Sequence, residues 1–213
     1  MSSDTSPKTT YHLYTFYASS CAARLRIALA LKNISYTSHY IDMGTDAHED
    51  PSYIALNPSA AIPTLVVETE GEPTFTFAQS VAMLEYLEET YPTRTPLLPP
   101  TADHRARARV RELMHIVTSD IFPPTNSRVA ESVKAVRGER DDAVTFVRTI
   151  MNRGFTAYET YLSTYFKDAK YSCGDVVTLA DVCLIPQVEQ ARFYKVDFGQ
   201  WPLLSGVIAR LEV

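Results

Sequence analysis

Residues 11–42 read YHLYTFYASSCAARLRIALALKNISYTSHYID, and this pattern predicts a strand, a helix and a second strand in close succession. Residues 11–17 are rich in aromatic and other β-forming side chains, and residues 36–42 share this character. Residues 21–32 contain neither Gly nor Pro, and their apolar side chains recur with a helical period. Because a helix-length connection joins the two strands, we expect a parallel pair with a right-handed crossover.

The next segment predicts an antiparallel hairpin followed by a helix. The stretch LNPSAAIPTLVVE (56–68) runs from a Pro-bearing loop into a strand, and EGEP (70–73) predicts a turn into a second short strand, TFTF. Residues 77–91, FAQSVAMLEYLEETY, form an amphipathic pattern that ends before Pro92. The predicted element order of the first region is therefore βαβββα.

A proline-rich stretch, PTRTPLLPPTADH (92–104), has the composition of a semi-rigid linker. The charge balance changes at the same place, because residues 1–90 hold 4 Lys and Arg against 11 Asp and Glu, whereas residues 91–213 hold 16 against 14. Beyond it, apolar residues at helical spacing predict helices that include residues 146–165 and 182–193. The predicted parts are a disordered tail at 1–10, an α/β domain at 11–91, a linker at 92–103 and an all-helical domain at 104–213.

Composition limits the classes of function. With 46% hydrophobic residues, 213 residues can bury a sizeable core, and a net charge of −5 argues against a nucleic-acid binder, which needs a basic surface. Three cysteines without a CxxC pair predict neither a disulfide framework nor a metal site, so we expect a reducing, cytoplasmic location. Nowhere does the sequence hold about 18 consecutive apolar residues, so no membrane span is expected.

Residues 175–186, DVVTLADVCLIP, contain a helix start with a clear mechanism. Thr178 and Asp181 have the spacing of a capping box, in which hydroxyl and carboxylate bind first-turn amides, and Val177 and Val182 stand at the positions of a hydrophobic staple. The alternative, Asp181 as a general base or metal ligand, has less support, because no His or second acid lies at helical ligand spacing. We therefore predict a structural role.

Four segments in this order resemble the glutathione transferases, and most of all their zeta class (maleylacetoacetate isomerase-like). They are SSCAARLRIALALK, LNPSAAIPTLV, FAQSVAMLEYLEE and YSCGDVVTLADVCLIPQV, and the similarity spans about residues 11–211. The resemblance implies an α/β thioredoxin-like N-terminal domain, an all-α C-terminal domain, glutathione as co-substrate and a homodimer.

Ser19, Ser20 and Cys21 precede the first predicted helix, and the resemblance implies that they activate the glutathione thiol. Lowering the pKa of a thiol requires hydrogen-bond donors and a positive field at the sulfur. A helix N-terminus supplies the field, and a serine hydroxyl adds a charge-assisted donor. Ser20 is the expected principal donor, with Ser19 and Cys21 assisting, although a plain helix cap would also explain the serine pair. Tyr14 is the alternative donor, because other classes use a Tyr seven residues before a Cys.

Further glutathione contacts are implied by the same resemblance. Ile62-Pro63 is expected to hold a cis bond that lets the Ile62 backbone pair with the cysteinyl unit. Gln79 and Ser80 are expected to hold the γ-glutamyl carboxylate at a helix N-terminus. Taken alone, Pro63 would be an ordinary strand-entry proline and Ser80 a helix cap. The remaining expected contacts are His48, where the class commonly has Gln, and Asn126.

The predicted substrate pocket departs from the zeta pattern. Phe122 stands where a Gln is common, and Ala23 where Trp is usual. The Arg that binds the substrate carboxylate is replaced by Phe193, with Arg192 one residue earlier and about 100° around the helix. A pocket that includes Phe122 and a displaced Arg192 is expected to accept neutral, hydrophobic electrophiles at least as well as a maleyl dianion.

Two classes of function remain open from the sequence. One is a zeta-type glutathione transferase that conjugates or isomerises small electrophiles. The other is a non-catalytic glutathione transferase-like module for dimerisation or scaffolding. An intact SSC, an Ile-Pro and a Gln-Ser favour the enzyme, because a scaffold needs none of them.

Overall fold

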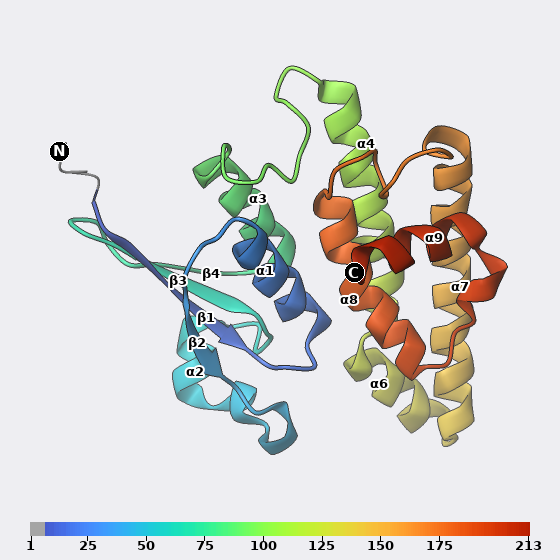
Figure 1. The fold of residues 1–213 in the computed structure, drawn as a ribbon. Coiled ribbons are helices and arrows are strands. Elements are labelled where there is room, and N and C mark those ends of the chain that lie inside the picture. The colour runs from blue at the N-terminus through green and yellow to red at the C-terminus, as the bar shows by residue number, and fades with distance from the viewer. Residues whose placement is uncertain (1–6) are drawn as a thin grey trace. The chain divides into compact units, whose positions relative to one another are not determined.

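The computed structural model describes residues 7–213, with the Arg137 side chain left aside, and divides into two compact units (Figure 1). Unit 1 ends at Thr95, and unit 2 runs from Pro96 to Val213, so the division falls within the predicted linker. Most of the predicted tail at 1–10 lies outside the described residues. Thr9 and Thr10 belong to the first strand instead of a tail.

Unit 1 is a four-stranded mixed sheet with helices on both faces. The strand order is β2-β1-β3-β4, with β1 and β2 parallel and the pairs β1–β3 and β3–β4 antiparallel. The predicted parallel crossover and the predicted hairpin are therefore confirmed. The elements are β1 (Thr9–Thr15), α1 (Ser20–Leu31), β2 (Thr37–Tyr40), α2 (Pro51–Leu56), β3 (Thr64–Thr69), β4 (Phe75–Ala78) and α3 (Ser80–Thr90).

Helix α2 is missing from the predicted order βαβββα. It has six residues, too few for a helical period to show, although Asp50 accepts from the backbone N–H of Ser52 and Pro51 occupies the first turn. An Asp followed by Pro is a helix start signal, so its N-terminus was readable in principle. The observed order is βαβαββα.

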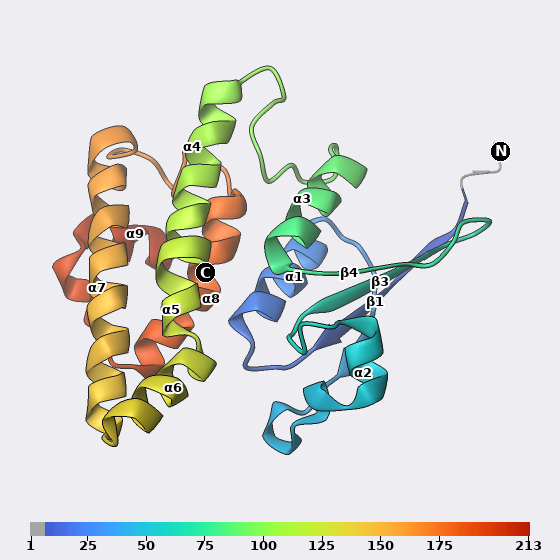
Figure 2. The same ribbon diagram turned by 180° about the vertical axis from the view of Figure 1, so that it is seen from behind.

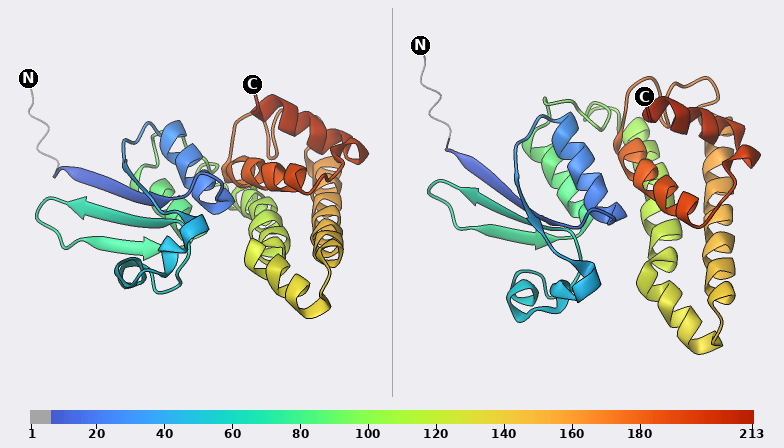
Figure 3. Two further views of the ribbon diagram at one scale, coloured as in Figure 1. Left: turned by 90° about the horizontal axis from the view of Figure 1, so that it is seen from below. Right: turned by 60° about the horizontal axis from the view of Figure 1, so that its bottom comes forward.

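The two faces of the sheet are covered differently (Figure 3). Helices α1 and α3 lie on one face, where Leu13 of β1 and Leu65 of β3 pair in register and are fully buried. Burying such a side chain contributes about 2 kcal/mol. Helix α2 lies on the opposite face, toward which Tyr14 and Thr64 are directed, since successive strand residues alternate.

A buried lysine anchors the end of unit 1. The amine of Lys32, at the C-cap of α1, lies 2.6 Å from the carboxylate of Glu88 on α3. It also donates to the backbone carbonyl oxygens of Tyr91, Arg94 and Thr95, at 3.2, 3.0 and 3.4 Å. The charge is thus paired and hydrogen-bonded, as a buried ammonium requires. Both helices and the chain leaving unit 1 are fixed at this point.

Unit 2 is all-helical, as predicted (Figure 2). Its helices are α4 (His104–His115), α5 (Phe122–Thr125), α6 (Ser127–Arg137), α7 (Arg140–Tyr165), α8 (Leu179–Phe193) and α9 (Pro202–Leu211), with a π-helical segment, Ile116–Ile121, joining α4 to α5. Helix α4 packs on α8, and α7 packs on α6 and α9. The predicted helices at 146–165 and 182–193 lie within α7 and α8, which begin earlier.

The N-terminus of α8 is closed by the predicted capping box. The carboxylate of Asp181 accepts from the backbone N–H and the hydroxyl of Thr178, at 2.8 and 3.0 Å, and from the backbone N–H of Ser172 at 2.9 Å. All three residues are buried. Burial raises the pKa of the Asp181 carboxyl, although these hydrogen bonds lower it. Every contact of this carboxylate serves the fold, in agreement with a structural role.

Candidate active site

The register of the sheet brings three predicted segments to one edge. Thr64, the first residue of β3, pairs with Tyr14 near the end of β1 and with Ala78 at the end of β4. The serine pair follows β1, the Ile-Pro bond precedes β3 and the Gln-Ser pair follows β4, so all three leave the sheet at this edge. Strand β2 ends there too, because Tyr40 pairs with Thr15.

The N-terminus of α1 is only partly capped. Ser19 is the N-cap, and its Oγ accepts from the backbone N–H of Ala22 at 3.2 Å, a contact typically worth about 1 kcal/mol. Ser20 begins the helix and is half-buried. The amides of Ser20 and Cys21 have no acceptor within the helix, so they and the helix dipole can face an anion. The cap assignment is correct for Ser19, and thiolate binding by Ser20 stays a prediction.

Cys21 belongs to a cluster between α1 and α3. The Nη1 of Arg24 donates to Sγ of Cys21 at 3.6 Å and to Oγ of Ser80 at 3.1 Å. Burial raises the pKa of the Cys21 thiol, whereas the Arg24 charge and a hydrogen bond with Ser80 lower it. A thiol kept protonated is a weak nucleophile. Cys21 therefore fits an assisting role and not one of attack.

The N-terminus of α3 has an unusual backbone. Gln79 has a φ of 76° and a ψ of 110°, and its side chain makes no capping hydrogen bond. A non-glycine residue held at such angles costs about 1–3 kcal/mol and is found mostly at ligand-binding sites. Gln79 is exposed, and Ser80, the first helical residue, is buried. The arrangement leaves the first amides of α3 available for an anion.

The peptide bond between Ile62 and Pro63 is cis, as predicted. Helix α2 holds this turn. The carbonyl oxygen of Ala61 accepts from the Tyr53 hydroxyl at 2.6 Å and from the side-chain amide of Asn57 at 2.7 Å. Both groups also contact Oγ1 of Thr64, at 2.8 and 3.1 Å. The two residues that flank the Ile-Pro bond are thereby fixed to α2. Glutathione binding by Ile62 stays a prediction.

His48 lies in a short 3-10 turn, residues 47–49, between β2 and α2. Its ring is buried, and Nδ1 has no hydrogen-bond partner among the residues that the structure describes. On its other side, Nε2 lies 3.9 Å from the carboxylate of Glu49. A buried ring nitrogen without a partner is costly, so a ligand or water there would be stabilising.

Tyr14, the alternative thiol donor, faces the α2 side of the sheet. Its ring stacks on His39 with centroids 4.6 Å apart, and the Tyr53 ring lies 5.9 Å away. Helix α1 lies on the other face (Figure 3), to which the neighbouring Leu13 is directed because successive strand residues alternate. This orientation favours Ser20 over Tyr14 as the donor at the N-terminus of α1.

The remaining predicted glutathione contact, Asn126, belongs to unit 2 and caps α6. Its carboxamide oxygen accepts from the backbone N–H of Arg128 at 3.0 Å, and the side-chain N–H groups could donate to a ligand. Phe122 is half-buried and begins α5. Their roles toward glutathione and substrate stay predictions.

Arg192 is held by carboxylates on the surface of unit 2. It donates to Glu189 at 2.6 Å and bidentately to Glu212, with one of the two distances 3.1 Å. Because of this pairing, chiefly with Glu212, the pKa of the guanidinium is raised. Its neighbour Phe193 is 78% exposed. A guanidinium that already binds two carboxylates has few N–H donors left for the carboxylate of a substrate. This pairing supports the expectation that Arg192 is displaced from the substrate-binding position.

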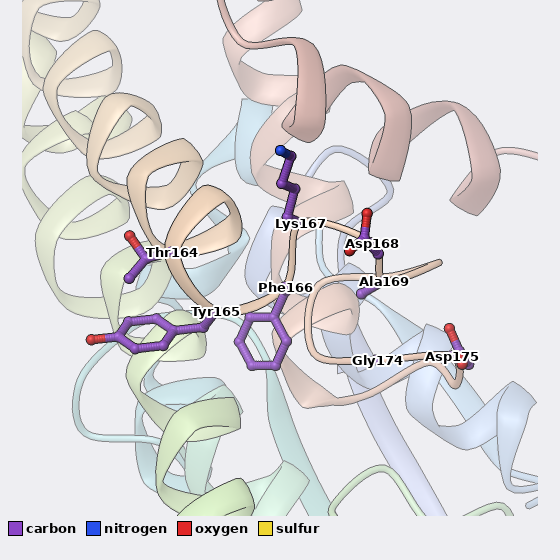
Figure 4. A pocket seen from close by; sticks show the side chains of 8 residues that line it. All are labelled: Thr164, Tyr165, Phe166, Lys167, Asp168, Ala169, Gly174 and Asp175. Carbon is purple, nitrogen blue, oxygen red and sulfur yellow. The ribbon is translucent and has the colours of Figure 1, made fainter.

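A surface hollow in unit 2 has none of the predicted site residues in its lining (Figure 4). The hollow is lined by Thr164, Tyr165, Phe166, Lys167, Asp168, Ala169, Gly174 and Asp175.

Within the described part of the chain, no group of three or more His, Cys, Asp or Glu could hold a metal ion, and no helix is long and apolar enough to cross a membrane.

Three residues of unit 1 contribute to this edge without having been singled out in the sequence. Arg24 could have been noticed in the sequence, because it is a charged residue within a predicted helix that is otherwise mostly apolar. Tyr53 and Asn57 carried none, because their hydrogen bonds depend on the packing of a six-residue helix against a strand that begins later in the chain.

Unit 1 is a sheet with helices on both faces and carries at one edge the three segments that are expected to bind glutathione, and unit 2 is all-helical. The models of the glutathione S-transferase N-terminal and C-terminal domains match residues 18–90 and 114–212. Maleylacetoacetate isomerase from Aspergillus fumigatus is 42% identical over 213 residues, which covers all of this chain and 89% of that protein. Maleylpyruvate isomerase from Ralstonia sp is 41% identical over 198 residues, covering 92% and 90%.

The solved structures that match this chain include isomerases of the same kind as these relatives. The holo structure of maleyl pyruvate isomerase, a bacterial zeta-class glutathione S-transferase, matches with a TM-score of 0.83 at 40% identity, covering 93% of this chain and 90% of that one. Maleylacetoacetate isomerase from Anaeromyxobacter dehalogenans, with glutathione in its active site, matches with a TM-score of 0.84 at 34% identity, covering 96% and 91%. The chain belongs to the zeta class of the glutathione S-transferase family, and it is an enzyme.

Proposed function

We propose that the N-terminus of α1 binds the thiolate of glutathione, with Ser20 as principal donor and with Ser19 and Cys21 assisting. Free first-turn amides and the helix dipole favour the thiolate over the thiol, which lowers the pKa of the bound sulfur. The Ser19 oxygen accepts from the Ala22 amide, and its hydroxyl hydrogen is still available. Within the described part of the chain, no capping hydrogen bond occupies the Ser20 hydroxyl, which is why Ser20 takes the main role.

The other segments hold the tripeptide. The backbone of Ile62, before Pro63, pairs with the cysteinyl unit, and Gln79 with Ser80 takes the γ-glutamyl carboxylate at the N-terminus of α3. His48 donates from its buried ring to glutathione, which would satisfy the nitrogen that lacks a partner among the described residues. The observation that carries the proposal is the register, which sets these segments at one edge of the sheet.

The similarity to maleylacetoacetate and maleylpyruvate isomerases supports cis–trans isomerisation of a maleyl compound as the reaction. The glutathione thiolate adds to one carbon of the cis double bond, and the electron pair moves onto the neighbouring carbonyl oxygen. The former double bond is now single and rotates. The electron pair then returns, the double bond re-forms as trans and the carbon–sulfur bond breaks, which releases the thiolate unchanged. Donors near the carbonyl oxygen would stabilise the negative charge.

Conjugation of neutral electrophiles is the second candidate, and Arg192 is the observation that favours it. Its guanidinium is bound by Glu189 and Glu212, and Phe122 offers no donor to a carboxylate. An apolar pocket with Phe122 would suit a neutral, hydrophobic electrophile. In that case the adduct is protonated at carbon, or loses a halide, and the carbon–sulfur bond is kept.

One preparation of the protein separates the two candidates. We expect kcat/KM for 1-chloro-2,4-dinitrobenzene, a neutral aryl halide, to be at least equal to that for maleylpyruvate, with glutathione present in both assays. The Arg192→Ala variant should change neither value more than about twofold, since the charge is already paired on the surface. A large preference for the maleyl dianion that Arg192→Ala abolishes would contradict this view of the pocket.

We also propose that the enzyme is a cytoplasmic homodimer. The uneven charge along the chain supports pairing of an acidic unit 1 with the more basic unit 2 of a second copy. Three cysteines that form no disulfide with one another agree with a reducing compartment. Sedimentation should show a dimer at micromolar concentration, weakened by salt, and a monomer alone would argue against pairing.

A further inference from the structure

Arg24 is the largest fully buried side chain among the described residues, with 1% of its surface exposed. It lies in the second turn of α1, directly behind the serine pair. Its Nη1 donates to the hydroxyl of Ser80 and to the sulfur of Cys21, and both of these acceptors are neutral. The guanidinium stands beside the N-termini of α1 and α3, whose helix dipoles are also positive there.

The hydrogen bond to Ser80 fixes the direction of the serine hydroxyl. Since Oγ of Ser80 accepts from Arg24, its own hydrogen must point elsewhere. The hydrogen bond between Ser80 and Cys21, which lowers the pKa of the thiol, uses this hydrogen, so the first backbone amides of α3 are the donors that remain for an anion. Arg24 thereby ties the N-terminus of α3 to that of α1 through Cys21.

We propose that Arg24 is a positioning residue for glutathione activation. Held behind Cys21 and Ser80, it keeps the two helix N-termini in place, so that α3 takes the γ-glutamyl carboxylate while α1 takes the thiolate of the same molecule. Its charge adds to the positive potential at both anions. This inference rests on the proposed binding of glutathione at the edge of the sheet.

Arg24 contacts both of the helices that carry the argument. Cys21 faces it from α1 and Ser80 from α3. The buried pair Lys32–Glu88 belongs to the far end of both helices, eight residues or about 12 Å along α1. Changes in the ionisation of a thiol bound at the helix N-termini would therefore report on Arg24 and not on that pair.

Two substitutions separate charge from geometry. Arg24→Met keeps the volume and removes the charge, so the pKa of bound glutathione, read from thiolate absorbance against pH, should rise by about one unit. Arg24→Lys keeps a charge but lacks the forked donors, so we expect this pKa to change by less than about 0.3 units while KM for glutathione rises about fivefold. A merely structural role would not split the two readouts in this way.

A modified ligand tests the connection through Ser80. γ-Aminobutyryl-cysteinyl-glycine is glutathione without the α-carboxylate of its γ-glutamyl unit. If Arg24 acts on that carboxylate through Ser80, the KM penalty of Arg24→Lys should shrink to less than about twofold with this analogue, because the partner group has gone. An equal penalty with both ligands would overturn the assignment to Ser80.

Arg94→Met serves as the matched control, because it makes the same change of charge at an exposed side chain that stacks on Tyr91. It should leave KM and the thiol pKa unchanged. Circular dichroism checks that each variant folds, and if Arg24→Met does not, the Lys variant and the analogue decide alone. Wild-type protein that never ionises glutathione would refute the proposed function. Normal ionisation in the wild type and in both Arg24 variants would refute only the role of Arg24.

Discussion

The N-termini of α8 and α1 both carry a hydroxyl residue at the N-cap, but their remaining hydrogen-bond donors are used differently. At α8, Thr178 and the buried Asp181 satisfy the donors around them, and the carboxylate also binds Ser172. At α1, Ser19 caps one amide, and Ser20, the first helical residue, is half-buried. A closed terminus uses its donors to stabilise the fold, whereas an open one keeps them for a ligand.

The N-terminus of α3 resembles that of α1, because its first amides are not fully capped. Its N-cap, Gln79, makes no capping hydrogen bond and has a positive φ. Helices α1 and α3 therefore both lack full caps, and both begin at the edge of the sheet that carries the predicted site. The comparison suggests a general rule for this chain: changes at α8 should affect stability, and changes at α1 or α3 should affect glutathione chemistry.

The largest effect is expected at the closed terminus. Asp181→Ala would leave the buried amides of Thr178 and Ser172 without acceptors and should lower the free energy of unfolding by about 3–4 kcal/mol. Urea denaturation measures this, while the KM for glutathione of the folded fraction stays as in the wild type. A cost below about 1 kcal/mol would show that the closed cap matters little.

The ionisation of Asp181 adds a pH signature. Its pKa is raised in the folded protein, mainly by burial, so the carboxyl favours folding most strongly when protonated. This contribution is complete below the unfolded pKa of about 4 and is lost as the pH rises through the folded value. The unfolding free energy of the wild type should therefore decline over that window relative to Asp181→Asn, whose side chain does not titrate.

The next effect is expected at the open terminus of α1. Ser20→Ala should raise the pKa of bound glutathione and slow conjugation by about 10²-fold, with little change in affinity, since the lost hydrogen bond acts mainly on the thiolate. Thermal unfolding should barely shift. Tyr14→Phe is the control and should leave the thiol pKa unchanged. If Tyr14→Phe raises it and Ser20→Ala does not, the donor assignment must be exchanged.

The smallest effect is expected at α3. Gln79→Gly should stabilise the fold by about 1 kcal/mol, because glycine adopts a positive φ without strain. Gln79→Ala keeps the strain and removes the same amide. Both variants should weaken glutathione binding severalfold, and only the glycine variant should gain stability in a melting experiment. Equal melting temperatures would mean that the backbone at Gln79 stores no strain.

The parts of the fold with local sequence signals were predictable in both units. Strong strand formers and a helix without Gly or Pro gave the crossover, and Thr178 with Asp181 gave a capping box three residues apart. The family resemblance added the cis bond at Ile62-Pro63, which no local pattern requires.

The parts that could not be predicted depend on contacts between distant residues. The link from Arg24 to Ser80 joins positions 56 residues apart, and Lys32 binds carbonyl oxygens about 60 residues away. Helix α2 is too short to show a period. The partners of Arg192 include Glu212, which lies outside α8, so the sequence could predict a displacement of this Arg along the helix but not its pairing.

Lys32 also has a consequence for chemical labelling. Its amine is buried, paired with Glu88 and bonded to three backbone carbonyl oxygens, so an acylating reagent can reach it only after α1, α3 and the departing chain separate. Lys8, by contrast, is exposed and should react at once. The slow acylation of Lys32, followed by mass spectrometry, would therefore measure how often unit 1 opens in the native protein.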